Sequence, residues 1–163
     1  MSELSAAVDH TMHLAQQRKM TVITVESCTA GALACALAEA EGASDTLQGG
    51  FVVYTKTNKS AALGVPRELI EKYTAVSAPV AKAMATAALI RSPADISLAI
   101  TGVAGPEPDE DGNPVGLAFV AAAARDGRTL EERLQLSGCK QDICRSVMLA
   151  VLRLADKLLL GEP

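Results

Sequence analysis

Two hydroxyl groups and a thiol stand side by side in the segment Glu26-Ser27-Cys28-Thr29-Ala30-Gly31. The β-branched run before it, TVITV (21–25), predicts a short buried strand, and the alanine- and leucine-rich run after it (32–40) predicts a helix. Free N–H groups at the start of that helix favour an anion, either a phosphate or a developing oxyanion. Ser27 is the first candidate nucleophile. Two alternatives stay open: Ser27 or Thr29 only caps the helix, or Cys28 is the nucleophile because a helix N-terminus lowers a thiol pKa.

A serine nucleophile needs a base, and histidine is not the expected one. The chain has two histidines, His10 and His13, and both fall in the first predicted helix. The segment Tyr54-Thr55-Lys56-Thr57-Asn58-Lys59 follows a second predicted strand and offers two lysines. A lysine can act as a base if desolvation lowers its pKa, and Tyr54 can relay a proton or donate to an oxyanion. The plainer interpretation is that both lysines are solvated surface residues.

A third loop, Thr101-Gly102-Val103-Ala104-Gly105-Pro106, follows another apolar run. Its glycines allow a ligand close to the backbone, and consecutive N–H groups can form an anion-binding nest. The loop matches neither a Walker A nor a GxGxxG pattern, and a tight turn is the alternative.

The remaining pattern predicts the elements that carry these loops. Strands are expected at 21–25, 51–54, 96–100, 115–123 and 129–136, and helices near the N-terminus, at 32–40, 66–73 and 77–91, and from about 143 to 158, with a helical turn at 61–64. The order predicts one domain over residues 1–163, a three-layer α/β fold with a mixed sheet and helices on both faces. Ligands are expected beyond the carboxyl ends of the strands.

Composition excludes several classes of protein. The chain has 163 residues, a net charge of −4 and a pI near 5.2, which argues against a nucleic-acid partner. No apolar run approaches the roughly 20 residues of a membrane span, and no signal peptide is visible. The four cysteines match no zinc or redox spacing, so we expect free thiols, no metal and a cytoplasmic location.

Taken together, the loops resemble the CinA C-terminal domain family. The resemblance rests on VESCTAG (25–31), GGFVVYTKTNK (49–59), LGV (63–65), AVS (75–77), ADISLAITGVAGP (94–106) and NPVG (113–116). It implies an α/β domain that often self-associates, as a homodimer or a higher homo-oligomer. It also implies hydrolysis of nicotinamide mononucleotide, an anionic nucleotide, to nicotinic acid mononucleotide and ammonia with no cofactor. The family's nucleophilic serine matches Ser27, and its assisting tyrosine and lysine match Tyr54 and Lys59, with Lys56 as a local extra.

The resemblance also implies a substrate site, with family positions near the ligand at Thr101, Gly102, Ala104, Gly105 and Arg145. We add Cys28, Thr29, Ala30 and Gly31, because the N–H groups from Cys28 to Ala30 are expected to bind the oxyanion. The chain departs from the family at Ala30, where a glycine is usual, and at Glu107-Pro108-Asp109-Glu110, where glycines are frequent. A nucleotide-binding module with weak or no activity, and an amidase for another anionic substrate, remain alternatives.

Overall fold

A five-stranded mixed sheet forms the middle layer of the protein. The computed structural model describes residues 1–163. The strands lie in the order β2-β1-β3-β4-β5; β1 pairs in parallel with both β2 and β3, whereas β3, β4 and β5 pair antiparallel. Their bounds are β1 Val22–Glu26, β2 Leu47–Val52, β3 Ile96–Gly102, β4 Leu117–Ala124 and β5 Thr129–Gln135.

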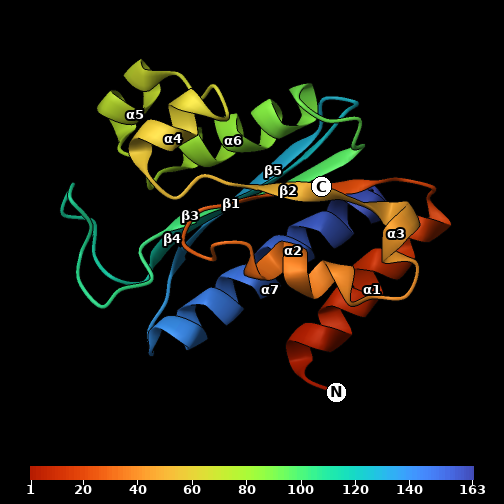
Figure 1. Cartoon of the computed structure of the whole chain (residues 1–163). Coiled ribbons are helices and arrows are strands. Elements are labelled where there is room, and N and C mark those ends of the chain that lie inside the picture. The colour runs from red at the N-terminus through yellow and green to blue at the C-terminus, as the bar shows by residue number, and fades with distance from the viewer.

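Helices cover both faces of the sheet, which confirms the predicted three-layer α/β architecture. In Figure 1, α4, α5 and α6 lie above the sheet, and α1, α2, α3 and α7 lie below it. The helices are α1 Glu3–Gln17, α2 Ala32–Ala38, α3 Ala43–Thr46, α4 Lys56–Ala61, α5 Arg67–Tyr73, α6 Ala78–Ile90 and α7 Lys140–Leu160. None of them combines the length and the apolar character needed to cross a lipid bilayer.

Each face of the sheet has its own apolar core. The larger core contains buried residues of α1, α2 and α7, and the smaller contains buried residues of α5 and α6. Strand β4 contributes to both, because successive side chains of a strand point to opposite faces. Ala121 and Ala123 belong to the α6 side, and Ala122 and Ala124 belong to the α7 side.

The sheet brings the three predicted functional loops together at the carboxyl ends of its parallel strands. Strand β1 lies between β2 and β3 and is buried throughout. Its last residue, Glu26, pairs with Val52 on one side and Ile100 on the other. Because β1, β2 and β3 are parallel, the segments that follow them start at the same end of the sheet. The loop after Glu26, the segment from Tyr54 and the loop from Gly102 therefore lie close together.

The structure differs from the predicted pattern around the two lysines. We expected a polar loop at 55–59 and a helical turn at 61–64, but α4 spans Lys56–Ala61. The reason is Thr55, whose hydroxyl oxygen accepts a hydrogen bond from the Asn58 N–H and caps the helix. Lys59 therefore lies within a helix, one turn beyond its cap.

Strand boundaries differ as well. Strand β2 starts at Leu47 and ends before Tyr54, although the sequence predicted a strand over 51–54. Strand β4 starts at Leu117 instead of 115, because the chain before it turns at Gly116. There φ is +91°, and the Cα lies against the carbonyl of Leu136.

Ser77 precedes α6 as predicted, but its hydroxyl donates to the Thr74 carbonyl rather than capping the helix.

Candidate active site

A cavity of about 340 Å³ opens where the three loops meet. Eight of the twelve residues proposed for the site from the sequence line this cavity: Ser27, Cys28, Tyr54, Lys59, Thr101, Gly102, Ala104 and Gly105. Its other walls come from the segments at 55–56, 75–76 and 103, and from the acidic loop at 107–110.

Ser27 and Lys59 form a buried pair at the cavity wall. Lys59 Nζ donates to Ser27 Oγ at 2.9 Å, to the Val53 carbonyl at 3.0 Å and to the Tyr54 carbonyl at 3.3 Å. The Ser27 hydroxyl in turn lies 3.3 Å from the Tyr54 carbonyl. Lys59 is only 2 % exposed and Ser27 is 5 % exposed. The amine is therefore held at the serine oxygen by two fixed carbonyls.

Burial gives Lys59 the character of a base. It lowers the pKa of the Lys59 amine from 10.5 to about 8, because the charged form loses water that no carboxylate replaces. At pH 7 roughly a tenth of the amine is then neutral, about 300-fold more than for an ordinary lysine. A neutral lysine in contact with a serine hydroxyl can accept its proton.

Lys56 has a different role, although it stands three residues away. Its Nζ lies 2.6 Å from Asp111 Oδ1 and 3.5 Å from Glu110 Oε1. The hydrogen bond to Asp111 raises the pKa of Lys56. A lysine that is paired with carboxylates and stays charged is a poor base, so the geometry favours Lys59.

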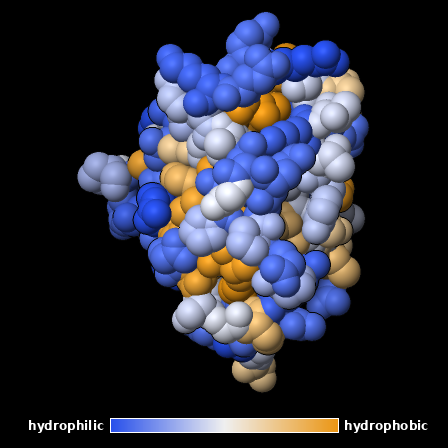
Figure 2. Space-filling model, turned by 90° about the vertical axis from the view of Figure 1, so that its left-hand side faces the viewer, coloured by the Kyte–Doolittle hydropathy of each residue, from blue (hydrophilic) through white to orange (hydrophobic).

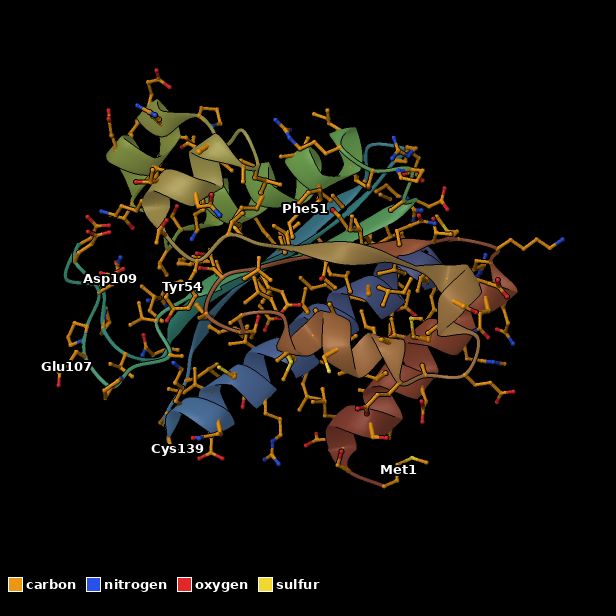
Figure 3. The ribbon with its side chains drawn as sticks, in the orientation of Figure 1. Met1, Phe51, Tyr54, Glu107, Asp109 and Cys139 are labelled. Atoms are coloured by element: carbon orange, nitrogen blue, oxygen red, sulfur yellow. The ribbon has the colours of Figure 1, made fainter.

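Tyr54 lies at the cavity, but its side chain does not contact the pair. The side chain is 58 % exposed, and Figure 3 shows it between the sheet and the projecting acidic loop. The contacts to Ser27 and Lys59 come from the Tyr54 main-chain carbonyl. In this structure the residue orients the lysine through its backbone, whereas the sequence suggested a phenol that relays a proton or donates to an oxyanion.

The start of α2 already holds an anion supplied by the chain itself. The Glu26 carboxylate is fully buried. Its Oε2 accepts from the Thr29 hydroxyl at 2.6 Å and from the N–H groups of Gly31 and Leu33 at 3.0 and 3.1 Å, and its Oε1 accepts from the Ala34 N–H at 2.8 Å. The predicted affinity of this helix end for an anion is thus satisfied by Glu26.

This arrangement changes the expected role of three residues. Thr29, Ala30 and Gly31 do not line the cavity. The Ala30 N–H donates to the Ser27 carbonyl at 3.0 Å, so it is not free to bind an oxyanion. Ala30 instead has a positive φ of +50°, and Gly31 has one of +99°. The backbone conformation at position 30 is therefore one that glycine adopts more readily than alanine.

Both loops carry N–H groups that have no partner within the chain. The N–H groups of Cys28 and Thr29, in the first loop, donate to no acceptor within the chain, and neither do those of Ala104 and Gly105 in the third loop. Cys28, Ala104 and Gly105 line the cavity. Unpaired donors beside a nucleophile can bind developing negative charge, so both loops can bind anionic groups.

The Cys28 thiol is unsuited to act as a nucleophile. Burial raises its pKa to about 12, with a further contribution from the neighbouring Cys144. The thiolate is the reactive form of cysteine, and it is scarce at neutral pH when the pKa is this high. The alternative of a cysteine nucleophile is therefore disfavoured.

The third loop is shaped by close packing. The Thr101 hydroxyl donates to the Ala75 carbonyl at 2.8 Å and is fully buried, so it fixes the strand end rather than reaching into the cavity. At Gly102 an added Cβ would lie 2.8 Å from Ala118 Cβ. Glycine at this position allows β3 to stay against β4 up to the cavity.

Arg145 is not brought to the site. It is an exposed residue of α7 and does not line the cavity. Its charge instead acts on Asp142. The Asp142 carboxylate accepts a hydrogen bond from the Cys139 N–H at the start of α7, and its bonds to Cys139 are the main reason why its pKa is lowered.

No three histidine, cysteine or carboxylate side chains cluster as ligands for a metal ion.

The acidic loop gives the cavity a negatively charged wall. Glu107, Asp109 and Glu110 line the cavity, and Figure 3 shows Glu107 and Asp109 on the loop that projects beyond the sheet. Asp109 is engaged within the loop, where it accepts from the N–H and side-chain amide of Asn113. Figure 2, which views this end of the molecule, shows mainly hydrophilic side chains with apolar surface between them.

Glu26 supports the loop that carries Ser27, and sequence reasoning gave it no role. The available signal was an acidic residue at the end of a strand, a few positions before a helix of small residues, where the helix dipole favours negative charge. The fold of the loop decides whether the side chain returns to the helix, and the sequence does not reveal that.

Residues 4–159 match the CinA C-terminal domain. The chain is 42% identical over 141 residues to a CinA-like protein of Mycolicibacterium gilvum (86% of this chain, 33% of the relative) and 45% identical over 122 residues to one of Mycobacterium marinum (75% and 29%). It thus spans about a third of the length of these curated relatives.

Solved structures agree with these matches. A CinA superfamily protein from Escherichia coli has a TM-score of 0.87 at 34% identity, covering 97% of this chain and 93% of that one. One from Klebsiella pneumoniae has a TM-score of 0.92 at 28% identity, covering 98% and 99%. The chain therefore belongs to the CinA C-terminal domain family.

Proposed function

We propose that this chain is an amidase that hydrolyses nicotinamide mononucleotide to nicotinic acid mononucleotide and ammonia, with Ser27 as nucleophile. The observation that carries the proposal is the 2.9 Å contact between Lys59 Nζ and Ser27 Oγ at the wall of the cavity. The lowered pKa of Lys59 supports it, because it makes the amine a base near neutral pH. The resemblance to a family with stand-alone deamidases supplies the substrate.

In the first half of the reaction, neutral Lys59 takes the proton of the Ser27 hydroxyl while Oγ forms a bond to the amide carbon. The free N–H group of Cys28, which lines the cavity next to the nucleophile, would donate to the oxyanion. Lys59 then passes its proton to the amide nitrogen, the carbon–nitrogen bond breaks and ammonia leaves.

In the second half, water attacks the ester. Lys59 takes a proton from the water, the tetrahedral intermediate collapses, and the Ser27 oxygen leaves with a proton returned from the lysine. The carboxylic acid product departs and the pair is restored. The carbonyls of Val53 and Tyr54 keep the amine at the serine oxygen through both halves.

The two sides of the cavity suit the two charges of this substrate. The N–H groups of Ala104 and Gly105 are free and would receive the phosphate. Glu107 and Glu110 would face the positively charged pyridinium ring of this substrate. An amide substrate with an uncharged ring would lack this attraction. The acidic loop thus favours a cationic ring over an uncharged one.

The test is ammonia release from nicotinamide mononucleotide by the wild type, Ser27→Ala, Lys59→Met and Lys56→Met. The first two variants are expected to lose about a thousandfold or more in kcat, whereas Lys56→Met, which leaves the Ser27–Lys59 contact intact, should lose less than about tenfold. Wild-type turnover by Ser27→Ala would remove the serine from this role.

A nucleotide-binding module without turnover is the second candidate. Three carboxylates line the cavity that would bind the phosphate, and their negative charge opposes productive binding of this anion. Such a module would melt at a higher temperature with nicotinamide mononucleotide and release no ammonia.

We further propose a cytoplasmic homodimer. The four free cysteines suit a reducing compartment, the pairing follows from the family resemblance, and light scattering would test it.

A further inference from the structure

Glu26 is a buried carboxylate that the reaction described above does not use. It ends β1, directly before Ser27, and has no exposed surface. A buried charge is costly unless it is paired or hydrogen-bonded. Four donors surround this one, and all four belong to the ten residues that follow it in the chain.

These hydrogen bonds fix the loop that carries the nucleophile. Glu26 lies before Ser27, and its partners Thr29, Gly31 and Leu33 lie after it, so the carboxylate closes a ring around the Ser27-Cys28-Thr29 turn. The turn is conformationally demanding, because Ala30 and Gly31 both have positive φ. Charge-assisted hydrogen bonds to a carboxylate are about twice as strong as neutral ones, which suits them to hold such a turn.

The same bonds decide which N–H groups remain free. Glu26 takes the donors of Gly31, Leu33 and Ala34, and the Ser27 carbonyl takes that of Ala30. The donors of Cys28 and Thr29, next to the serine, are left without an acceptor. The carboxylate therefore separates the structural donors of the helix from those available to the reaction.

We propose that Glu26 is a positioning residue, which with the Thr29 hydroxyl holds the Ser27 turn so that Oγ meets Lys59 and the Cys28 N–H group faces the oxyanion. The inference rests on the proposed serine chemistry and not on the identity of the substrate. Glu26 acts through the turn and not through the base, since all of its hydrogen bonds go to the turn and the start of α2 and none goes to Lys59.

The test measures the rate at which a fluorophosphonate probe labels Ser27, which needs no knowledge of the substrate. In this reaction Oγ forms a bond to phosphorus, fluoride leaves and Lys59 takes the hydroxyl proton. Glu26→Gln preserves the shape but replaces one acceptor oxygen with a donor, and is expected to be labelled at least tenfold more slowly. Thr29→Val should be several-fold slower, and Thr29→Ser, which retains the hydroxyl, should restore the rate.

Two further measurements separate positioning from other effects. Ser2→Ala removes a helix cap at the start of α1, far from the site, and should be labelled at the wild-type rate. The pH midpoint of labelling, which reports Lys59, should be the same in all variants. Ammonia release from nicotinamide mononucleotide, where it occurs, should show a lower kcat with little change in KM.

The outcomes distinguish the two proposals. A wild type that is labelled at Ser27 but releases no ammonia would reject the substrate and leave the positioning role to be decided by the variants. Labelling of Glu26→Gln and Thr29→Val within twofold of the wild type would overturn the role, as would a shifted pH midpoint. If Glu26→Gln does not fold, the Thr29→Val and Thr29→Ser pair decides.

Discussion

Replacing Lys59 with methionine is expected to remove a pH-dependent destabilisation of the fold. Burial lowers the pKa of Lys59 from 10.5 to about 8, so the unfolded chain binds this proton more tightly than the folded chain. The cost to the folded state is fully present below pH 8 and disappears above about pH 10.5. It amounts to about 3 kcal/mol at pH 7 and about 1.4 kcal/mol at pH 9.5. The wild type should therefore gain about 2 kcal/mol relative to Lys59→Met over this interval.

Urea unfolding of both proteins at pH 7, 8 and 9.5 measures this change. The difference between the two proteins at each pH includes the hydrogen bonds that methionine cannot make. This part is the same at every pH, so it cancels when the differences at two pH values are compared. Lys56→Met is the matched control. The pKa of Lys56 is raised by Asp111, so its contribution to stability is retained until the pH rises through that pKa, and its difference from wild type should stay flat to pH 9.5. A difference between wild type and Lys59→Met that is constant over the interval would refute the argument.

Three other predictions concern the site and its supporting turns. The kcat/KM for ammonia release should rise about tenfold from pH 7 to a plateau, with a midpoint near the Lys59 pKa of about 8, because the base must be neutral; a midpoint above 10 would exclude it. Ala30→Gly should stabilise the protein by about 1 kcal/mol because φ is positive there, whereas Ala36→Gly, within α2, should destabilise it by about as much in the same urea titration. Gly116→Ala should cost several kcal/mol more than Gly127→Ala in thermal melts, as both have positive φ but only the first is crowded by a carbonyl, so equal costs would contradict the packing described.

The architecture and the location of the site were predictable because they depend on patterns that are local in the chain. The β-branched run before Glu26 and the apolar run before Thr101 predicted strands, and strands β1 and β3 formed there. Polar loops at the carboxyl ends of parallel strands then had to meet, and they do. The paired roles of Ser27 and Lys59 were reached through the family resemblance, since composition alone left Lys59 as a surface lysine.

What the sequence did not reveal depends on where individual atoms point. The choice between Lys56 and Lys59 follows from a short helix capped by Thr55, which buries one lysine and leaves the other beside Asp111. The contribution of Tyr54 comes from its carbonyl, and any residue type has one. Glu26 could equally have faced solvent, because the return of its side chain to α2 depends on the turn that follows.

The four consecutive alanines that end β4 set limits on how this protein can change. Two of them pack toward α6 and two toward α7, and all four are buried. With only a methyl group on each face, both helical layers lie close to the strand. Adding methylene groups to a well-packed core typically costs about 1–3 kcal/mol, so a larger residue here would have to be accommodated by a whole helix. Sequence drift in this strand should therefore be slow and coupled to the facing helices, and stabilising designs have more freedom at the strained turns than in the centre of the sheet.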